Sequence, residues 1–248
     1  MEAGELAFFM ISAGLVTSLL DHPSSVVRQG LPDPTARRLI IGLLMGATAI
    51  VIVHSPWGRQ SGAHMNPSLT LTFLRLGKVA PLDAAFYVTA QFVGAVVGIT
   101  VAAAIIGPAL ASPDVRYIST TPGSFGRGAA FIAEMTISFV LMLTVLTTSN
   151  AMKLAKFTPW LVGILIATYI TVEAPLSGMS MNPARTFGPA LFGHVWDALW
   201  IYFAAPPLGM LLAAELYVRI RGTHAVWCAK LHHLNHKRCI FRCEYPAL

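Results

Sequence analysis

Apolar residues along the chain fall into six long stretches that lack Asp, Glu, Lys and Arg, and turn-forming residues lie between them. A helix that crosses a hydrocarbon core of about 30 Å needs about 20 mostly apolar residues, and tilt or polar helix ends relax that length. The pattern therefore predicts an all-α membrane protein with six spans, over or around Leu6–Leu20, Leu39–Gly58, Ala84–Pro113, Met135–Met152, Phe157–Val172 and Ala198–Ala214.

The composition agrees with this interpretation and excludes several other classes of protein. Of the 248 residues, 55% are hydrophobic and 11% are charged, whereas about 25% are charged in soluble domains. A chain with so few charges cannot cover a soluble surface, and it is too apolar for a disordered protein or a coiled coil. We expect the lipid bilayer to surround most of the chain.

The distribution of basic residues predicts the orientation of the chain. The formal net charge is +6, but no basic run is interleaved with aromatic residues, so the sequence does not predict nucleic-acid binding. Six spans place both termini on one side, where the loops and tail carry eleven basic residues; the opposite loops carry five, with Arg185 set aside. Because basic loops stay in the cytoplasm, we expect both termini to be cytoplasmic, at the plasma membrane.

Two segments between the predicted spans repeat each other. Ser61–Leu71 (SGAHMNPSLTL) and Ser177–Phe187 (SGMSMNPARTF) are identical at six of eleven positions without a gap. The first segment follows the second span and the other follows the fifth span, so they enter the membrane from opposite faces. This arrangement predicts an inverted repeat of two halves, about 1–110 and 128–218.

An Asn-Pro pair in each segment predicts the start of a short helix. Asn is a favoured N-cap and Pro is a favoured first helical residue, and Gly77 and Gly193 are suitable stops. About ten residues at about 1.5 Å each give about 15 Å, which is half of a hydrocarbon core. We therefore expect two re-entrant half-helices that meet tip to tip at the midplane.

This meeting point predicts a barrier to ions. Both tips are helix N-termini with positive dipole ends, and the amides of Asn66 and Asn182 can spend their oxygens on the caps and turn their N–H donors into a lumen. A passing water or alcohol oxygen accepts from these donors. Cations and protons are repelled there, whereas neutral hydroxyl-bearing molecules are not.

Two acids lie at matching places in the first and fourth spans, Glu5 and Glu134. An acid inside a span is costly unless it faces partners. We expect each carboxylate to accept backbone N–H groups of a re-entrant loop. A position at the helix end, near the lipid headgroups, is the alternative.

These motifs resemble those of the aquaporin, or major intrinsic protein, family from about Glu5 to Val218. Besides the Asn-Pro loops, the resemblance rests on Tyr87–Gly94 (YVTAQFVG) and Trp200–Pro206 (WIYFAAP). It implies six spans and two half-helices around an hourglass pore in each subunit, and assembly as a homotetramer. The pore residues that it implies are Asn66, Pro67, Ser68, Asn182, Pro183 and Ala184.

The resemblance also implies a constriction at the outer mouth of the pore. It places Arg185 there with Ile170, Met179 and Met45. Gly46 is the alternative to Met45, because the loop before Asn66 is one residue longer than usual. Arg185 would supply a fixed positive charge and a fork of donors. Water-selective members of the family have a His where this chain has Ile170. Residues that resemble the water-channel pattern more than the glycerol-channel pattern are Thr186, Ala190, Tyr202 and Phe203.

The composition changes after Val218, so we predict one channel domain over 1–218 and a basic Cys/His-rich tail over 219–248. Cysteine and histidine are good zinc ligands. One straight helix does not easily surround a metal, and an amphipathic segment on the inner membrane surface is the alternative. The candidate ligands, whose spacings of 4, 4, 3 and 4 predict one stripe of a helix, are Cys228, His232, His236, Cys239 and Cys243.

The predicted function is passive conduction of water, and of other small neutral solutes, with exclusion of protons and ions. Two alternatives stay open: a less selective facilitator for glycerol or hydrogen peroxide, and a metal-responsive membrane protein that acts through its tail. An enzyme is not predicted, because Gly178–Asn182 lacks the last glycine of Gly-x-Ser-x-Gly and no His-Glu-x-x-His occurs. We expect no catalytic residue and no cofactor.

Overall fold

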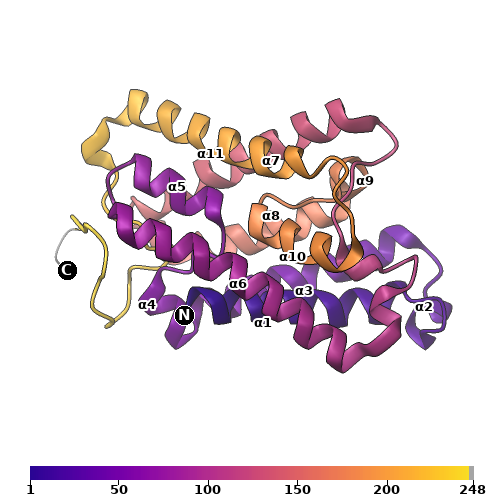
Figure 1. Cartoon of the computed structure of the whole chain (residues 1–248). Helices are drawn as coiled ribbons and strands as arrows, with labels where there is room; N and C mark the ends of the chain where they lie inside the picture. The colour runs from indigo at the N-terminus through magenta and orange to yellow at the C-terminus, as the bar shows by residue number, and fades with distance from the viewer. Residues whose placement is uncertain (246–248) are drawn as a thin grey trace.

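A computed structural model describes residues 1–245 and is built almost entirely of helices (Figure 1). Six helical segments are long and apolar enough to cross a membrane, which confirms the six predicted spans. They are α1 (Glu2–Asp21), α3 (Pro34–His54), α6 (Pro81–Ile106) with its continuation η1 (Gly107–Ala111), α7 (Gly126–Ser149), α8 (Thr158–Val172) preceded by η3 (Ala155–Phe157), and α11 (Leu199–Arg221).

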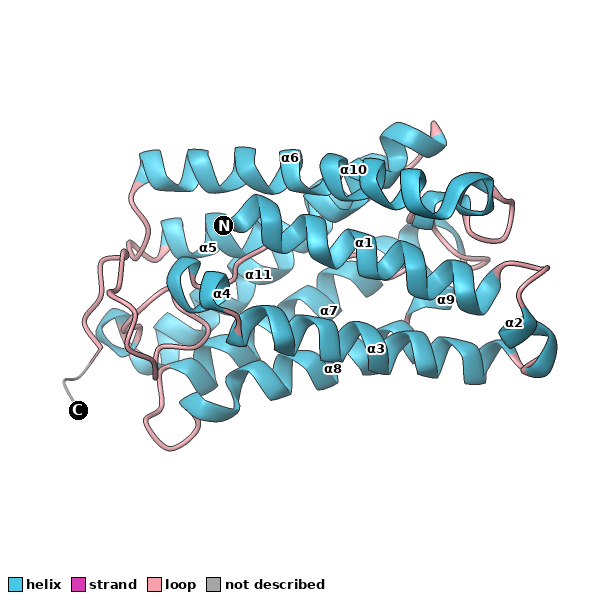
Figure 2. Ribbon diagram, turned by 90° about the horizontal axis from the view of Figure 1, so that it is seen from below, coloured by secondary structure: helices cyan, strands magenta, loops and turns pink. Residues whose placement is uncertain are grey.

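The two predicted half-helices are α5 (Pro67–Arg75) and α10 (Pro183–Gly193). The N-terminus and the described part of the tail lie at the same end of the bundle, which we call the terminal end; the opposite end is the far end (Figures 1 and 2). Helix α5 lies toward the terminal end and α10 toward the far end. The predicted all-α fold, with six spans and two oppositely inserted half-helices, is therefore confirmed.

Short helices connect these elements and set up the re-entrant loops. Helices α4 (Pro56–Ser61) and α9 (Ala174–Ser177) occupy equivalent places, each just before a loop that leads into a half-helix. Each ends at a glycine with a left-handed backbone, where a side chain would be strained. The remaining short elements are α2 (Val26–Gly30), η2 (Arg116–Ile118) and η4 (Thr223–Ala225).

Glycines allow the spans to pack closely. A Cβ atom at Gly46 of α3 would lie 2.4 Å from the backbone oxygen of Gly163 in α8, and one at Gly94 of α6 would lie 2.3 Å from that of Ala3 in α1. These helix backbones therefore approach as closely as small-residue contacts in membranes permit. The outer faces of the spans instead carry exposed large apolar side chains, such as those of Leu43, Phe86 and Ile105, as expected for a surface in contact with lipid.

The prediction of a helical stripe in the tail is wrong. Between Val226 and Tyr245 the described tail has no helix, and it folds back over the terminal end beside α4 and α5 (Figure 1). Its backbone donors bond to the bundle: Leu231 N donates to Gly62 O at 3.3 Å and Arg242 N to Lys78 O at 3.1 Å. Tertiary contacts thus satisfy groups that a helix would have paired internally.

The alternative of an amphipathic segment laid on the membrane is also wrong for the start of the tail. Of the residues that would supply its apolar face, Leu231 is 4% exposed, and Val226 and Cys228 near it are 0% and 3% exposed. These side chains are buried against the protein itself.

Candidate functional site

The two half-helices begin with the same capping arrangement. Asn66 Oδ1 accepts from the backbone N–H of Ser68 at 2.9 Å, and Asn182 Oδ1 accepts from those of Ala184 and Arg185 at 3.1 and 3.2 Å. Pro67 and Pro183 stand at the first helical position of each. Each amide oxygen is therefore spent on its own helix N-terminus, as the Asn-Pro motif predicts.

The two tips are tied to each other through the same amides. Asn66 Nδ2 donates to the backbone oxygen of Met181 at 2.7 Å, and Asn182 Nδ2 donates to that of Met65 at 2.6 Å. The sequence predicts that both N–H donors of each amide face the lumen. The structure differs from this prediction: one of the two N–H donors of each amide bonds to the opposite loop. One N–H donor of each amide is left for a passing solute.

The loops before the asparagines repeat an unusual backbone conformation. Gly62 and Gly178 have φ of 88° and 83°. Ala63, Met65, Met179 and Met181 also have positive φ, between 49° and 55°, which costs about 1 kcal/mol or more for each non-glycine residue. The repetition at equivalent positions in both halves indicates that the loop geometry is built in and must be held by neighbouring groups.

Buried carboxylates supply that support. Glu134, 0% exposed, accepts from Ser180 N at 2.6 Å with one oxygen and from Met181 N at 2.7 Å with the other; its first oxygen also accepts from the Ser177 hydroxyl at 2.8 Å. This agrees with the role that the sequence predicts for Glu134: a carboxylate inside a span accepts the backbone donors of the second loop.

In the first half, two acids divide the role that Glu134 fills alone. Glu2 accepts from His64 N at 2.9 Å and from Met65 N at 2.7 Å, whereas Glu5 accepts from the Ser61 hydroxyl at 2.7 Å. The predicted backbone role therefore belongs to Glu2, and Glu5 holds the serine at the start of the loop. Glu5 and Glu2 are both buried, so the headgroup alternative does not describe Glu5.

Three supporting residues were not assigned a role from the sequence, although they lie in the motifs that carry the family resemblance. Tyr87 and Tyr202 donate to the backbone oxygens of Ser61 and Ser177 at 2.7 and 2.5 Å, again at equivalent places. Gln91, which is 0% exposed, donates to Glu2 at 2.6 Å. The sequence feature that could have identified Gln91 is a polar amide side chain inside an otherwise apolar span.

A cavity of about 170 Å³ lies between the loops and the surrounding spans. Its lining contains both asparagines and both re-entrant loops, together with apolar side chains of α1, α3, α7 and α8. Met45, Ile170, Met179 and Arg185 all line it. Gly46, the alternative to Met45, does not, because it packs against α8.

Arg185 is half-buried and is held at the far half of the cavity. Its Nη1 donates to the hydroxyl of Thr120, a buried residue of the loop before α7. This bond fixes one end of the guanidinium fork, and the rest of the fork can serve a solute in the cavity.

His64 both lines the cavity and makes ordinary loop hydrogen bonds. Its Nδ1 lies 3.0 Å from the Thr70 hydroxyl, and its Nε2 lies 2.8 Å from the backbone oxygen of Ala229 in the tail. The first loop is therefore in direct contact with the tail.

The structure gathers only part of the predicted metal-ligand set of the tail. Cys228, Cys239 and Cys243 come together, and the histidine beside them is His233. His232 instead lies against the ring of His54, and His236 is exposed. The predicted ligands His232 and His236 are therefore corrected to His233, because the non-helical path of the tail turns a different histidine toward the sulfurs.

Comparison with known proteins agrees with this geometry. The family model described as Major intrinsic protein matches residues 6–217. The chain is 32% identical over 189 residues to Aquaporin A of Dictyostelium discoideum, covering 75% of this chain and 67% of that protein. It is 35% identical over 188 residues to Glycerol uptake facilitator protein-like 6 of Lactiplantibacillus plantarum, covering 75% of this chain and 86% of that protein.

A solved structure shares the fold. The X-ray structure of the aquaglyceroporin from Plasmodium falciparum superimposes with a TM-score of 0.72 and 18% sequence identity, covering 90% of this chain and 96% of that chain. The likeness concerns the arrangement of the spans and half-helices.

The division of work between the two acids of α1 gives a testable prediction. Glu2→Gln places an N–H₂ group against a backbone donor of the first loop. We therefore expect the free energy of unfolding to fall by about 1–3 kcal/mol and the melting temperature in detergent to fall by about 3–10 °C. Glu5→Gln keeps an oxygen for Ser61, and we expect a fall of less than about 2 °C. If Glu5→Gln destabilised the protein as much as Glu2→Gln, the assignment of the backbone role to Glu2 would be wrong.

Proposed function

We propose that this chain conducts water and excludes protons and ions. The chain belongs to the major intrinsic protein family, and it is a membrane channel of that family rather than an enzyme. The observation that carries the proposal is the pair of amides at the meeting point of the half-helices. Asn66 and Asn182 each cap a helix N-terminus and each keep a donor for the cavity.

The electrostatics of this point support selection against cations. Each helix N-terminus contributes about half a positive charge, and the two face each other beside the cavity. A water molecule accepts a hydrogen bond from an asparagine amide through its oxygen, which turns its own hydrogens away from the neighbouring water and opposes proton transfer along the file. No carboxylate lines the cavity among the described residues; Glu2 and Glu134 lie behind the loops and accept from their backbone N–H groups.

The lining of the cavity suits a small neutral solute, and the resemblance of Thr186, Ala190, Tyr202 and Phe203 to the water-channel pattern favours water. Met45, Ile170 and Met179 present apolar surface, and Arg185 supplies the charged donors. A less selective facilitator for glycerol or hydrogen peroxide is the second candidate. It is favoured by the apolar Ile170, which leaves the ring amphipathic, and by the similarity to a protein named as a glycerol uptake facilitator.

Stopped-flow measurements on proteoliposomes distinguish the two candidates. The water channel predicts faster osmotic shrinkage than in empty liposomes with little glycerol or peroxide uptake; the facilitator predicts uptake of all three solutes. Shrinkage no faster than in empty liposomes would contradict both.

We also propose cytoplasmic termini, a location in the plasma membrane and assembly as a homotetramer. The excess of basic residues at the terminal end supports the orientation, and the exposed apolar faces of the spans suit contact with lipid and with neighbouring copies. Native mass spectrometry is expected to give the mass of four chains. An epitope attached to the C-terminus of the protein is expected to resist a protease added outside intact cells.

Replacement of either pore asparagine by aspartate tests the electrostatic barrier. A carboxylate in Asn66→Asp or Asn182→Asp removes the donor and adds a negative charge. At an effective dielectric constant of about 20, a unit charge about 4 Å away contributes about 4 kcal/mol. We therefore expect potassium flux into proteoliposomes to rise at least about tenfold, with lower water flux. Gln29→Glu, the same change on the exposed helix α2, is the control. Unchanged flux and selectivity in both pore variants would refute the pore assignment.

Removal of the arginine tests the outer constriction. In Arg185→Ala the side chain that is held by Thr120 no longer occupies the cavity, so we expect glycerol-driven swelling of proteoliposomes to become severalfold faster relative to water flux. Arg127→Ala is the matched control, because Arg127 lies at the same end with a side chain 59% exposed. Equal glycerol rates in Arg185→Ala and wild type would show that Arg185 does not narrow the pore.

A further inference from the structure

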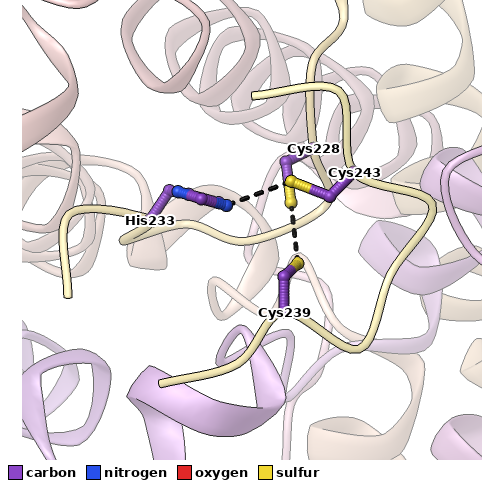
Figure 3. Close-up of side chains that lie close together, drawn as sticks. All are labelled: Cys228, His233, Cys239 and Cys243. Atoms are coloured by element: carbon purple, nitrogen blue, oxygen red, sulfur yellow. Dashed lines mark hydrogen bonds between the residues drawn. The ribbon is translucent and has the colours of Figure 1, made fainter. Parts of the chain in front are cut away.

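Four side chains of the tail converge on one point at the terminal end. Cys228, His233, Cys239 and Cys243 point toward one another in Figure 3. Their ligand atoms all lie within 4.8 Å of one another. The four residues, which we call the tail cluster, form a Cys-x₄-His-x₅-Cys-x₃-Cys sequence within sixteen residues.

The spacing of these atoms suits a tetrahedral zinc ion. Zn–S bonds of about 2.3 Å and Zn–N bonds of about 2.0–2.1 Å place tetrahedral sulfurs about 3.8 Å apart and a sulfur and a nitrogen about 3.6 Å apart. The sulfurs of Cys228 and Cys239 are 3.4 Å apart, and His233 Nε2 is 3.1 Å from the sulfur of Cys243. Three sulfurs and one imidazole are a common closed zinc ligand set.

We propose that Cys228, His233, Cys239 and Cys243 bind one Zn²⁺ ion, which fixes the segment 229–232 at the terminal mouth of the pore. Four protein ligands leave no open coordination position, so the ion has a structural role and not a catalytic one.

The surroundings of the tail cluster favour a bound thiolate–metal complex. Three thiolates and one Zn²⁺ carry a net charge of −1, and the buried Lys230 follows two residues after the first ligand, with its ammonium donating to the backbone oxygen of Lys237 at 3.2 Å. Release of the thiol protons accompanies metal binding.

An aromatic ring orients the histidine of the cluster. The ring of Tyr245 stacks on His233 at 4.0 Å with an angle of 7° between the planes, and Trp227 packs against the edge of Tyr245 at 5.3 Å. Residues that fix a ligand ring in this way support metal affinity.

The segment between the first two ligands lies at the mouth of the pore. The backbone oxygen of Ala229 is 2.8 Å from His64 Nε2, and Leu231 N donates to Gly62 O at 3.3 Å. The Leu231 side chain is 4% exposed and lines the pore cavity. Because Cys228 and His233 flank this segment, one ion bound to both restrains it at each end.

The later part of the tail is fixed to the same end of the bundle. Glu244, next to the last ligand, forms an ion pair with Lys78 at 3.0 Å, and the ring of Phe241 stacks on His64 at 5.4 Å. The tail cluster therefore joins two segments of the tail. One contacts the first re-entrant loop, and the other contacts that loop and the end of α5. Loss of the ion would release Leu231 from the mouth.

Metal content of the full-length protein in detergent tests the zinc site. We expect about one zinc per chain, measured by elemental analysis against protein concentration, and near-complete loss in Cys239→Ser and in His233→Ala. His236→Ala is the matched control, because His236 is an exposed histidine of the same tail, and we expect it to keep its zinc. No zinc in the wild type, or equal zinc in all four proteins, would overturn the proposal.

Alkylation of the wild-type protein gives a second measurement that needs no variant. We expect all three cysteines to resist iodoacetamide until a chelator is added and then to gain three alkyl groups by mass. Three groups gained before chelation, or a mass two hydrogens lower with Cys228 joined to Cys239, would overturn the zinc site.

Water flux tests whether Leu231 restricts the mouth of the pore, and this test rests on the proposed function. We expect severalfold faster shrinkage of proteoliposomes after zinc removal, and a similar gain in Leu231→Ala with its zinc content unchanged. A zinc-binding protein whose flux responds to neither change would refute the restriction at the mouth while the site stands. Failure of every protein to conduct water would refute the proposed function, since metal content is measured independently of flux.

Discussion

Two helix N-termini that face each other repel, because each carries about half a positive charge. In this protein the same pair of side chains that caps the helices also holds them together. Asn66 and Asn182 give their oxygens to their own helices and donate to the backbone oxygens of Met181 and Met65 in the opposite loops. The repulsion is therefore retained as a positive potential at the cavity, while the hydrogen bonds fix the distance between the two tips. The proposed selection against cations and the geometry of the pore would then have one cause.

The arrangement requires compensation elsewhere, because the loops carry strained residues and backbone donors inside a membrane protein. Glu134 meets this need alone in the second half by accepting two backbone N–H groups and a serine hydroxyl. In the first half, Glu2 accepts the backbone groups and Glu5 accepts the serine. Two carboxylates close together repel each other, and the donation from Gln91 to Glu2 offsets part of that cost. The two halves thus have the same loop geometry with different support.

The spans and half-helices could be predicted because their signals are local: lengths of apolar sequence and the capping preference of Asn-Pro. The choice between Glu2 and Glu5 could not, since residues three apart share a helix face and only the position of the loop selects one of them. The tail was predicted wrongly for a similar reason. Its Cys and His spacing suits a helix, but hydrogen bonds to Gly62 and Lys78 hold it in an irregular path. On that path the adjacent residue His233, rather than His232, meets the sulfurs.

The symmetry of the two loops fails at one position, and this position explains why the tail contacts the first re-entrant loop. His64 and Ser180 are equivalent, and each contacts the hydroxyl of a threonine in the half-helix that follows. The imidazole has a second nitrogen, which reaches the tail at Ala229 O, whereas a serine hydroxyl is too short to bridge in this way. The next residue, Met65, supplies the oxygen that accepts from Asn182. A displacement of the tail at the terminal end therefore reaches the asparagine pair through two consecutive residues, while the far mouth, with Arg185, has no comparable contact with the tail among the described residues.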